Sequence, residues 1–476
     1  MPDNLYNTIP YSTFPKLHTH PDRLAAVGTL LGMTPAPVTR CRLLEVGCGN
    51  ASNLIPMAYG LPESRFTGVD LAGEPIAAGR QNIAALGLEN ISLEVADLLD
   101  IGAGYGEFDY IVAHGLYSWI PTDVRDRLLA LCRERLAPQG IAFVSYNAMP
   151  GRHVRQMLRE MMLYHTRNIQ EPVERVKQAR WFLEFLLKAR IVSPPWQTLL
   201  DHEIQLTIDH GEGGLFHDDL SQINDAVYFR DFASHAARHG LQYLGEADPN
   251  EMFDPLGSLT WLEGSVTERE QYLDFIKARR FRQTLLCHQG VALHRDAGPA
   301  GMDRFLFTAP ARNLEGGQIE GLHGVRITAV HDAVRRVTGA LGDAYPLPLA
   351  FEELLPYAGD DRDALSEILF GLMIGGFADI HVYDFPCEET VTPKPRASRL
   401  ARHQARLSAH VTNACHHVIE LDDMARRMVC LLDGSRDHEQ VAQSLAEVPG
   451  APPLEDVRRH LPGSLQWMAK MGLLEA

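Results

Sequence analysis

Three acidic residues, Glu45, Asp70 and Asp97, lie at or near the ends of short apolar segments that have the pattern of β-strands. A glycine loop, Gly47 to Gly49, follows the first of them. In an open parallel sheet, ligands bind outside the carboxyl ends of the strands, and a glycine turn lets the backbone approach the ligand closely. A carboxylate about twenty residues after the glycines can accept hydrogen bonds from both ribose hydroxyls, and Asp70 has that position. The spacing predicts a site for a cofactor that contains a nucleoside.

The residues around the glycine loop distinguish between possible cofactors. A dinucleotide site favours a third glycine at position 52, where it permits close packing around a pyrophosphate, and this chain has Ser52. The carboxylate of Glu45, just before the loop, would repel a phosphate and attract an amino group. S-Adenosylmethionine carries an ammonium, a sulfonium and a ribose but no phosphate. We therefore predict an S-adenosylmethionine site.

The elements that must position these residues alternate between strands and helices from residue 42 to residue 147. Such alternation predicts a parallel sheet with helices on both faces. Residues 150–195 break the pattern, because they hold two long stretches with apolar residues at helical spacing and no strand between them. Strand-like segments return after residue 227. We therefore expect the sheet to be completed by a later part of the chain, across a helical insertion.

The expected organisation has five parts. The insertion carries Met157, Met161 and Trp181, which favours a dimerisation surface over a cap on its own subunit. Two later units share a plan of short helices followed by an apolar helix, as in winged-helix modules. The parts are an N-terminal lid with the cofactor-binding core over 1–148, the helical insertion over 149–226, the completion of the core sheet or regulatory region over 227–292, a winged-helix-like middle domain over 293–395 and a winged-helix-like C-terminal domain over 396–476.

Several segments resemble class I methyltransferases, and within that class the bacterial family with a methyltransferase regulatory domain, whose better-known members are the rickettsial protein lysine methyltransferases. They include LLEVGCGNASNLIPMA, GEFDYIVAHGLYSWIP and VSYNAMPGRHVRQMLREMMLYH, within residues 1–290. The resemblance implies an α/β fold: a Rossmann-like core with a mostly parallel seven-stranded sheet, a helical dimerisation element and C-terminal winged-helix-like domains. Two positions depart from it, because Ala51 replaces the last glycine of the loop and Arg152 replaces an aromatic residue.

Cofactor contacts are expected at the strand ends and in the N-terminal leader, which either folds over the cofactor as a lid or only packs on the core. Glu45 and the glycine loop would face the methionine part, Asp70 the ribose, and Asp97 with Leu98 the adenine. We expect no metal site: we interpret the isolated pair His18-x-His20 as ordinary surface, and the seven cysteines are scattered. The expected cofactor-binding residues are Tyr11, Glu45, Gly47, Cys48, Gly49, Asn53, Asp70, Leu71, Asp97, Leu98 and His114.

The methyl acceptor would lie beside the ends of the fourth and fifth strands. A lysine amine has an ordinary pKa of about 10.4, so it must lose a proton before it attacks. Burial against aromatic rings lowers that pKa, which favours an aromatic slot. The alternative is that Tyr117 and Trp119 pack in the core or on the cofactor; His114 would either take the proton or stack near the adenine. The expected substrate-facing residues are His114, Tyr117, Trp119, Tyr146 and Asn147.

Composition limits the partners and the compartment. The 476 residues include 45% hydrophobic and 22% charged residues and carry a formal net charge of −17. This charge disfavours binding to nucleic acid and favours a basic protein or peptide. The arginine-rich stretch between residues 394 and 406 is interpreted as a linker that enters a helix with a solvated face. No apolar run reaches the length of about 18 residues that a membrane span needs, and no secretory leader is evident, so we expect a cytoplasmic protein.

Three functions remain open from the sequence. The first is an S-adenosylmethionine-dependent methyltransferase that acts on lysine side chains of a protein or peptide, working as a homodimer. The second keeps the cofactor but modifies a small molecule or a peptide carboxylate in a biosynthetic pathway. The third is a non-catalytic regulatory protein that binds S-adenosylmethionine and a partner without methyl transfer.

Overall fold

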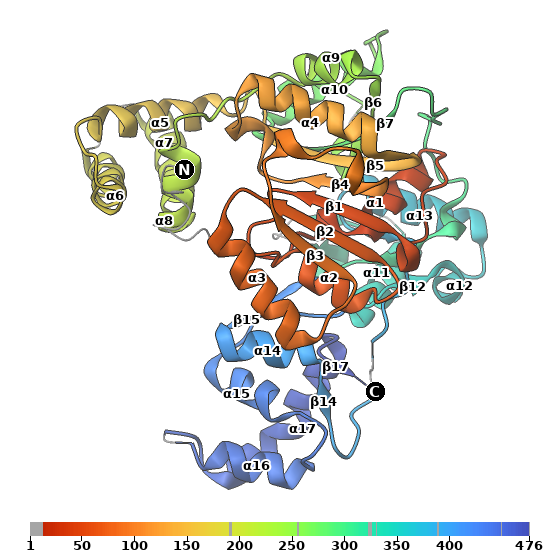
Figure 1. Ribbon diagram of the computed structural model, residues 1–476. Coiled ribbons are helices and arrows are strands. Elements are labelled where there is room, and N and C mark those ends of the chain that lie inside the picture. Colours follow the sequence, from red (N-terminus) through yellow and green to blue (C-terminus); the bar gives the residue numbers. More distant parts are fainter. Residues whose placement is uncertain are drawn as a thin grey trace.

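The computed structural model describes residues 13–189, 193–254, 257–321, 326–329, 331–387, 390–448 and 450–475. At its centre is a seven-stranded sheet with strand order β3-β2-β1-β4-β5-β7-β6 (Figure 1). The strands are parallel except β7, which is antiparallel to both of its neighbours. They are β1 (Arg42–Val46), β2 (Arg65–Asp70), β3 (Ile91–Val95), β4 (Phe108–Ala113), β5 (Leu136–Asn147), β6 (Leu241–Glu246) and β7 (Phe281–His288).

Both faces of this sheet are buried, as the apolar character of its strands requires. On one face, Leu43, Phe66 and Phe143 pack with helices α1 (Pro21–Leu30), α2 (Leu54–Gly60) and α3 (Gly73–Leu86). On the other face, residues such as Val144 pack with α4 (Thr122–Arg135) and α9 (Phe229–Arg238). Helix α10 (Val266–Lys277) lies beside α9. The core is therefore a three-layer α/β structure.

The strand order reverses between β1 and β4, the two central neighbours. Helices that leave such a point cross to opposite faces of the sheet, so a crevice opens at the carboxyl ends of the strands. The carboxyl ends of β1, β2, β3 and β4 lie at this same edge. The last two strands come from residues 241–288, so the sheet that carries the early strand-end residues is completed by a distant part of the chain.

A helical unit separates β5 from α9 and projects away from the sheet (Figure 1). It has its own apolar core, which includes Leu158, Met162 and Leu183. The buried Arg155 donates two hydrogen bonds to the carboxylate of Asp219, at 2.8 and 2.7 Å, and so ties the first helix to the end of the unit. Its elements are α5 (His153–His165), α6 (Pro172–Ala189), α7 (Pro194–Asp209), α8 (Gly211–Gly214) and the π-helical turn η7 (Leu215–Asp219).

The middle part of the chain builds a second core against α1. The antiparallel strands β12 (Leu349–Ala350), β8 (Leu306–Thr308) and β13 (Asp379–His381) form a small sheet. Its apolar core includes Ala26 and Leu30 of α1, so this part packs directly on the core that contains the seven-stranded sheet. That it is a winged-helix-like domain stays a prediction. Its helices are α11 (Asp332–Ala344), α12 (Phe351–Leu354) and α13 (Arg362–Ile374), and a further small sheet joins β9 (Arg312–Asn313), β10 (Gln318–Glu320) and β11 (Arg326–Thr328).

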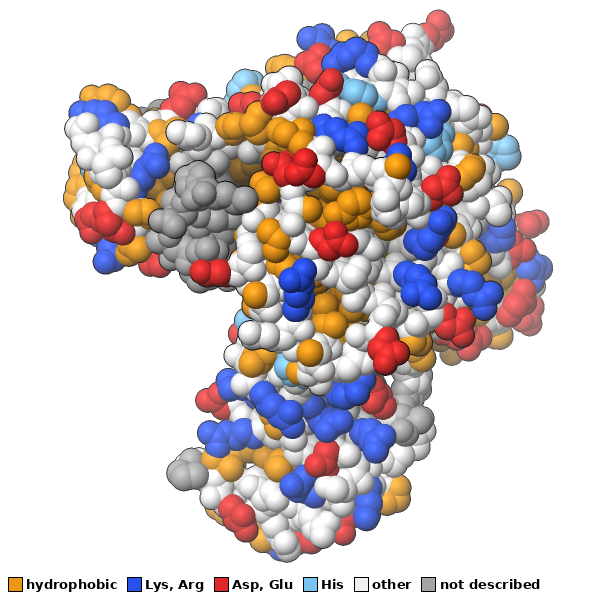
Figure 2. Space-filling view, in the orientation of Figure 1, with side chains coloured by type: hydrophobic (Ala, Val, Ile, Leu, Met, Phe, Trp, Pro, Cys, Tyr) orange, Lys and Arg blue, Asp and Glu red, His pale blue; other side chains and the backbone are white. Residues whose placement is uncertain are grey.

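The C-terminal part forms a separate domain with its own apolar core. Basic side chains form a band where this domain meets the core (Figure 2). In the first segment of the domain, Arg396, Arg399 and Arg406 are exposed. Among the described residues, no helix combines the length and apolarity needed to cross a bilayer. The elements of the domain are β14 (Arg396–Ala397), α14 (Arg399–Leu407), β15 (His410–Thr412), β16 (Val418–Glu420), α15 (Asp423–Leu431), α16 (His438–Ala446), α17 (Leu454–Lys470) and β17 (Leu474–Glu475).

Candidate functional site

The glycine loop between β1 and α2 is held against the end of β2. Gly47 and Gly49 have left-handed backbone angles, with φ of 76° and 54°. The Gly49 amide donates to Oδ2 of Asp70 at 2.8 Å, and the Ala72 amide donates to its Oδ1 at 2.8 Å. Asp70 therefore joins its own turn to the glycine loop, and it is partly exposed at the strand edge. Ala51 also has a left-handed φ, 58°, a conformation in which glycine would be less strained.

Glu45 is 5% exposed and points from β1 toward the same loop. Its Oε1 accepts a hydrogen bond from the Asn53 amide at 2.8 Å. Its Oε2 is buried and has no partner among the described residues. Burial raises the pKa of Glu45 to about 8, and the nearby Asp70 carboxylate adds to the rise. A buried carboxylate oxygen without a partner fits a ligand cation such as the ammonium of S-adenosylmethionine.

The ends of β2 and β3 offer an apolar platform beside a carboxylate. Leu71 is 62% exposed and Leu99 is 51% exposed, which is unusual for leucine next to buried strands. Oδ1 of Asp97 accepts a hydrogen bond from the Leu99 amide at 2.9 Å and so orders this turn. Leu98, in contrast, is buried in the core, so only its backbone is near the edge. The arrangement suits a flat heterocycle such as adenine; Leu99 was missed, although an apolar residue two places after Asp97 was visible in the sequence.

The N-terminal segment crosses the glycine loop. The Thr13 hydroxyl donates to Oδ1 of Asn50 at 2.7 Å, and the Lys16 amide donates to Oδ1 of Asn53 at 2.8 Å. Asn53 thus links this segment to Glu45. Cys48 is buried in the loop, and burial raises the pKa of its thiol. The Tyr11 prediction lies outside the described residues.

The interpretation of His18 and His20 as ordinary surface is wrong for His20. This residue is 4% exposed, and its Nδ1 accepts a hydrogen bond from the Asp22 amide at the start of α1. A histidine that caps a buried helix cannot be identified from a His-x-His pattern, because the pattern carries no information on burial.

His114 follows β4 at the crevice and is partly exposed. Its Nδ1 lies 3.2 Å from Oγ of Ser145, and its ring contacts the rings of Phe143 and Phe281. Burial, together with the charge of Lys16, lowers the pKa of His114 to about 3. The imidazole is therefore neutral at neutral pH and does not hold an additional proton at that pH.

Two of the aromatic residues expected to face the substrate are buried instead. Tyr146 is fully buried, stacks on Phe232 at a centroid distance of 4.2 Å and shares a hydrogen bond of 3.1 Å with Thr284. The Tyr117 hydroxyl lies 2.9 Å from Nδ1 of His235. Because side chains alternate along β5, Tyr146 points to the face covered by α9. This burial favours the core-packing alternative for Tyr117 and packs Tyr146 in the core as well. Contact of either tyrosine with a substrate stays a prediction.

The other two expected substrate-facing residues occupy the same loops. Trp119 is half-buried, and its indole N–H has no partner among the described residues. Asn147 is buried, and its side-chain amide donates to Oδ1 of Asn224 at 2.7 Å. This bond attaches the end of β5 to the segment that follows the helical unit. Contact of Trp119 or Asn147 with a substrate stays a prediction.

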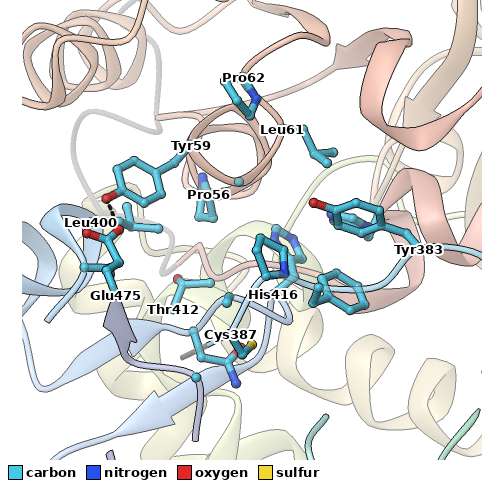
Figure 3. A pocket seen from close by; sticks show the side chains of 18 of the residues that line it. Pro56, Tyr59, Leu61, Pro62, Tyr383, Cys387, Leu400, Thr412, His416 and Glu475 are labelled. Atoms are coloured by element: carbon cyan, nitrogen blue, oxygen red, sulfur yellow. Dashed lines mark hydrogen bonds between the residues drawn. The ribbon is translucent and has the colours of Figure 1, made fainter. Parts of the chain in front are cut away.

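A cavity of about 470 Å³ lies away from this edge, between α2 and the C-terminal domain (Figure 3). It contains none of the strand-end acids, so it is not the cofactor site. His416 at its wall lies with Nε2 3.2 Å from Oδ1 of Asn53, which connects the C-terminal domain to the Glu45 network. Tyr59 and Glu475 hydrogen bond across its rim. Its lining also includes Leu61, Tyr383, Phe385, Cys387, Leu400 and Thr412.

Together, the strand order, the glycine loop and the orphaned Glu45 oxygen define a class I S-adenosylmethionine-dependent methyltransferase. The sequence matches three families: residues 43–140 match the methyltransferase domain, residues 212–288 the predicted methyltransferase regulatory domain, and residues 393–448 the PKMT C-terminal winged helix domain. The cofactor is S-adenosylmethionine.

Two proteins of Rickettsia prowazekii (strain Madrid E) are similar along the chain. The uncharacterized protein RP789 is 30% identical over 475 residues, which cover 93% of this chain and 85% of the relative. The uncharacterized protein RP028 is 34% identical over 240 residues, covering 50% of this chain and 96% of the relative. The structure of PKMT2 from Rickettsia typhi in complex with AdoHcy is 27% identical, has a TM-score of 0.86 and covers 98% of this chain and 100% of that chain. The chain belongs to this family of methyltransferases with a regulatory domain and a PKMT winged helix domain.

The protonation of Glu45 gives a first prediction. With a pKa of about 8, Glu45 is protonated in the free protein at neutral pH, and a cationic ligand group favours its ionised form. Binding then releases a proton, so affinity for S-adenosylhomocysteine should rise up to about tenfold per pH unit as the pH approaches 8, and level off above it. Calorimetric titration between about pH 6 and pH 9 measures this. Glu45→Gln should bind S-adenosylhomocysteine more weakly, and its affinity should not show the rise with pH that comes from ionisation of Glu45.

The amino group of the free ligand has the same pKa in both experiments, and the two proteins are compared at pH values where this group is protonated. The difference between wild type and Glu45→Gln therefore isolates Glu45. Parallel pH profiles for the two proteins would contradict the assigned role.

Proposed function

We propose that this methyltransferase modifies lysine side chains of a protein or peptide. The observation that carries the proposal is the similarity to PKMT2 of Rickettsia typhi over 98% of this chain, which extends beyond the methyltransferase core into the PKMT winged helix domain. We interpret that relative as a protein lysine methyltransferase. A small-molecule enzyme would need only the core, whereas the additional domains favour a polypeptide substrate. The net charge of −17 favours a basic one.

The strand-edge residues have separate roles in this proposal. Glu45 and the glycine loop hold the amino acid part of S-adenosylmethionine, Asp70 the ribose, and Leu71 with Asp97 the adenine. When bound, the cofactor supplies a methyl group on a positively charged sulfur, so the protein must mainly position the acceptor and favour its neutral form. In this arrangement the methyl group of the bound cofactor would lie next to His114.

His114 positions a neutral amine and does not take its proton. An imidazole with a pKa of about 3 stays unprotonated at neutral pH, so it serves as a hydrogen-bond acceptor. The lysine ammonium loses its proton to solvent as it enters the crevice, where desolvation and the nearby Lys16 charge oppose a second cation. His114 would hold the neutral amine with its lone pair directed at the methyl group that bound S-adenosylmethionine would supply.

This role of His114 gives a second prediction. His114→Ala should lower kcat/KM by about tenfold, the value of one hydrogen bond in the transition state, and leave cofactor affinity nearly unchanged. Because lysine deprotonation sets the pH dependence, kcat/KM should rise with pH with the same slope in both proteins. Steady-state kinetics from about pH 6.5 to pH 9 measures both quantities. A loss of the slope in the variant would indicate that His114 is the proton acceptor after all.

The proposed function is tested with S-adenosylmethionine labelled in its methyl group and a panel of lysine-rich proteins. We expect base-stable label that disappears when the substrate lysines are first blocked by acetylation, which removes the nucleophilic lone pair. Base-labile label would indicate a carboxylate ester, and label confined to small molecules would place the substrate outside proteins. Asp70→Ala serves as the matched control for background labelling.

We further propose that the helical unit forms the contact of a homodimer. Its surface exposes large apolar side chains, including Tyr164, Trp181 and Phe185, and Trp181 stacks on Phe185 at a centroid distance of 5.8 Å. Exposed apolar groups of this size usually mark an interaction site.

The dimer gives a third prediction. Light scattering on the full chain should give about twice the 53.0 kDa of one chain. The double variant Trp181→Glu, Phe185→Glu should give the mass of one chain, because two charges on each side would be buried at the contact. The matched control Glu184→Gln changes a neighbouring polar residue on the same helix and should remain dimeric. A wild-type protein that is monomeric at micromolar concentration would exclude the proposed contact.

A further inference from the structure

Helices α4 and α9 bring one carboxylate and two imidazoles together on the outer face of the core. Asp126 lies on α4, His235 lies on α9, and His239 follows the end of α9. Nε2 of His235 is 2.8 Å from Oδ1 of Asp126, and Nε2 of His239 is 3.0 Å from the same oxygen. One potential ligand atom from each of the three residues lies within 4.8 Å of the others.

The spacing of the two histidines explains their convergence. Residues four apart on a helix lie on the same face, one turn above the other. Both rings turn the same nitrogen, Nε2, toward the Asp126 carboxylate, which is supplied by a separate helix. Sequence reading missed the cluster, because Asp126 is more than a hundred residues away from both histidines and the pair alone is a common helical pattern.

The environment of His235 is the one found around metal-bound histidines. A ligating imidazole usually holds its second nitrogen in a hydrogen bond that fixes the ring. Nδ1 of His235 lies 2.9 Å from the hydroxyl of the buried Tyr117, so the ring is fixed with Nε2 facing outward. The Asp126 side chain, in contrast, is 60% exposed. The site is therefore rigid on its inner side and open to solvent on its outer side.

We propose that Asp126, His235 and His239 bind a divalent transition metal ion, with Zn²⁺ as the best match. Zinc commonly takes three protein ligands from histidine and carboxylate and a water as the fourth. Calcium and magnesium prefer oxygen ligands and fit two imidazoles poorly. Tetrahedral ligation with bonds of about 2.0 to 2.2 Å would separate the ligand atoms by about 3.3 Å. Oδ1 of Asp126 lies 2.8 and 3.0 Å from the two Nε2 atoms, so the exposed carboxylate would shift outward to admit the ion.

A bound ion would stabilise the contact between α4 and α9. Helix α9 belongs to the later part of the chain that completes the sheet, and α4 belongs to the earlier part. Through His235 and Tyr117, the ion would also fix the loop that follows β4. The site lies outside the proposed cofactor and acceptor contacts, so we assign it a structural role and its test does not depend on the methyl acceptor.

The test uses the full chain, freed of metal with a chelator, and titrates Zn²⁺ by calorimetry and Co²⁺ by visible spectroscopy. We expect one Zn²⁺ per chain, an absorption spectrum of four-coordinate Co²⁺, and a higher thermal unfolding temperature with Zn²⁺. His239→Gln and Asp126→Asn should each weaken Zn²⁺ binding at least tenfold and remove the temperature shift. Asp126 is exposed and His239 is partly exposed, so the variants should fold, which circular dichroism checks.

His202→Ala, which removes an exposed histidine of the helical unit, is the matched control and should bind Zn²⁺ as the wild type does. Equal Zn²⁺ affinity in wild type, His239→Gln and Asp126→Asn would overturn the proposal. So would the absence of measurable Zn²⁺ binding by the wild type at micromolar concentration.

Discussion

Replacing Asp70 with alanine is expected to weaken the binding of S-adenosylmethionine by about 100-fold or more. The carboxylate accepts hydrogen bonds from the amides of Gly49 and Ala72, so it shapes the glycine loop as well as the proposed ribose contact. Hydrogen bonds to a charged group contribute about 1.5 to 3 kcal/mol each, and about 2.7 kcal/mol corresponds to 100-fold in affinity. Calorimetric titration with S-adenosylmethionine and S-adenosylhomocysteine measures the loss.

Two further variants show whether the loss comes from the carboxylate itself. Asp70→Asn keeps one acceptor oxygen, so its affinity for S-adenosylmethionine should lie between those of Asp70→Ala and the wild type. Asp100→Ala removes an exposed acid near the same edge of the sheet and should bind the cofactor normally. If Asp70→Ala folds and binds S-adenosylhomocysteine with wild-type affinity, the ribose is held elsewhere.

Local patterns were sufficient to predict the layout of the cofactor edge. Strand periodicity and the glycine loop put Glu45, Asp70 and Asp97 at the ends of three strands, and the structure has these strands side by side in one parallel sheet. Strand ends are local properties, and the parallel arrangement follows from the alternation of strands and helices. The identity of the cofactor followed from chemistry, because a carboxylate before the loop suits an amino group.

Contacts between distant segments could not be predicted in this way. Asn53 was expected to touch the cofactor, but its bonds to Lys16 and His416 join three parts of the chain that no periodicity connects. Tyr117 and Tyr146 are buried because α9 covers the face of the sheet to which they point. A strand end predicts proximity to the crevice but does not say which face a side chain occupies when the covering helix comes much later in the chain.

The buried charge network around Arg282 illustrates this dependence on distant segments and gives the prediction with the largest effect on stability. Arg282 of β7 is almost fully buried, with its guanidinium 3.9 Å from the centroid of the Phe229 ring. It bonds to carboxylates on β6 and on α10, those of Glu246, Glu270 and Asp274. One side chain therefore connects α9, α10, β6 and β7, the elements that complete the sheet.

Arg282→Met should lower the free energy of unfolding by about 3 to 5 kcal/mol, because it leaves carboxylates buried without their main cation. Methionine fills most of the volume, so the loss reflects charge more than packing. Denaturant unfolding followed by circular dichroism measures it. Arg269→Met, an exposed position on α10, should change stability by no more than about 0.5 kcal/mol.

The pH dependence separates a charge effect from a packing effect. Burial already raises the pKa of Glu270 and of Asp274 while Arg282 opposes the rise, so removing the arginine should raise both further. A carboxyl with a raised pKa in the folded state binds a proton that the unfolded chain has lost, and stability then falls as the pH rises above the unfolded pKa. The deficit of Arg282→Met should therefore be smaller near pH 5 than near pH 8. A deficit that is the same at both values would mean that lost packing, and not the unpaired carboxylates, destabilises the variant.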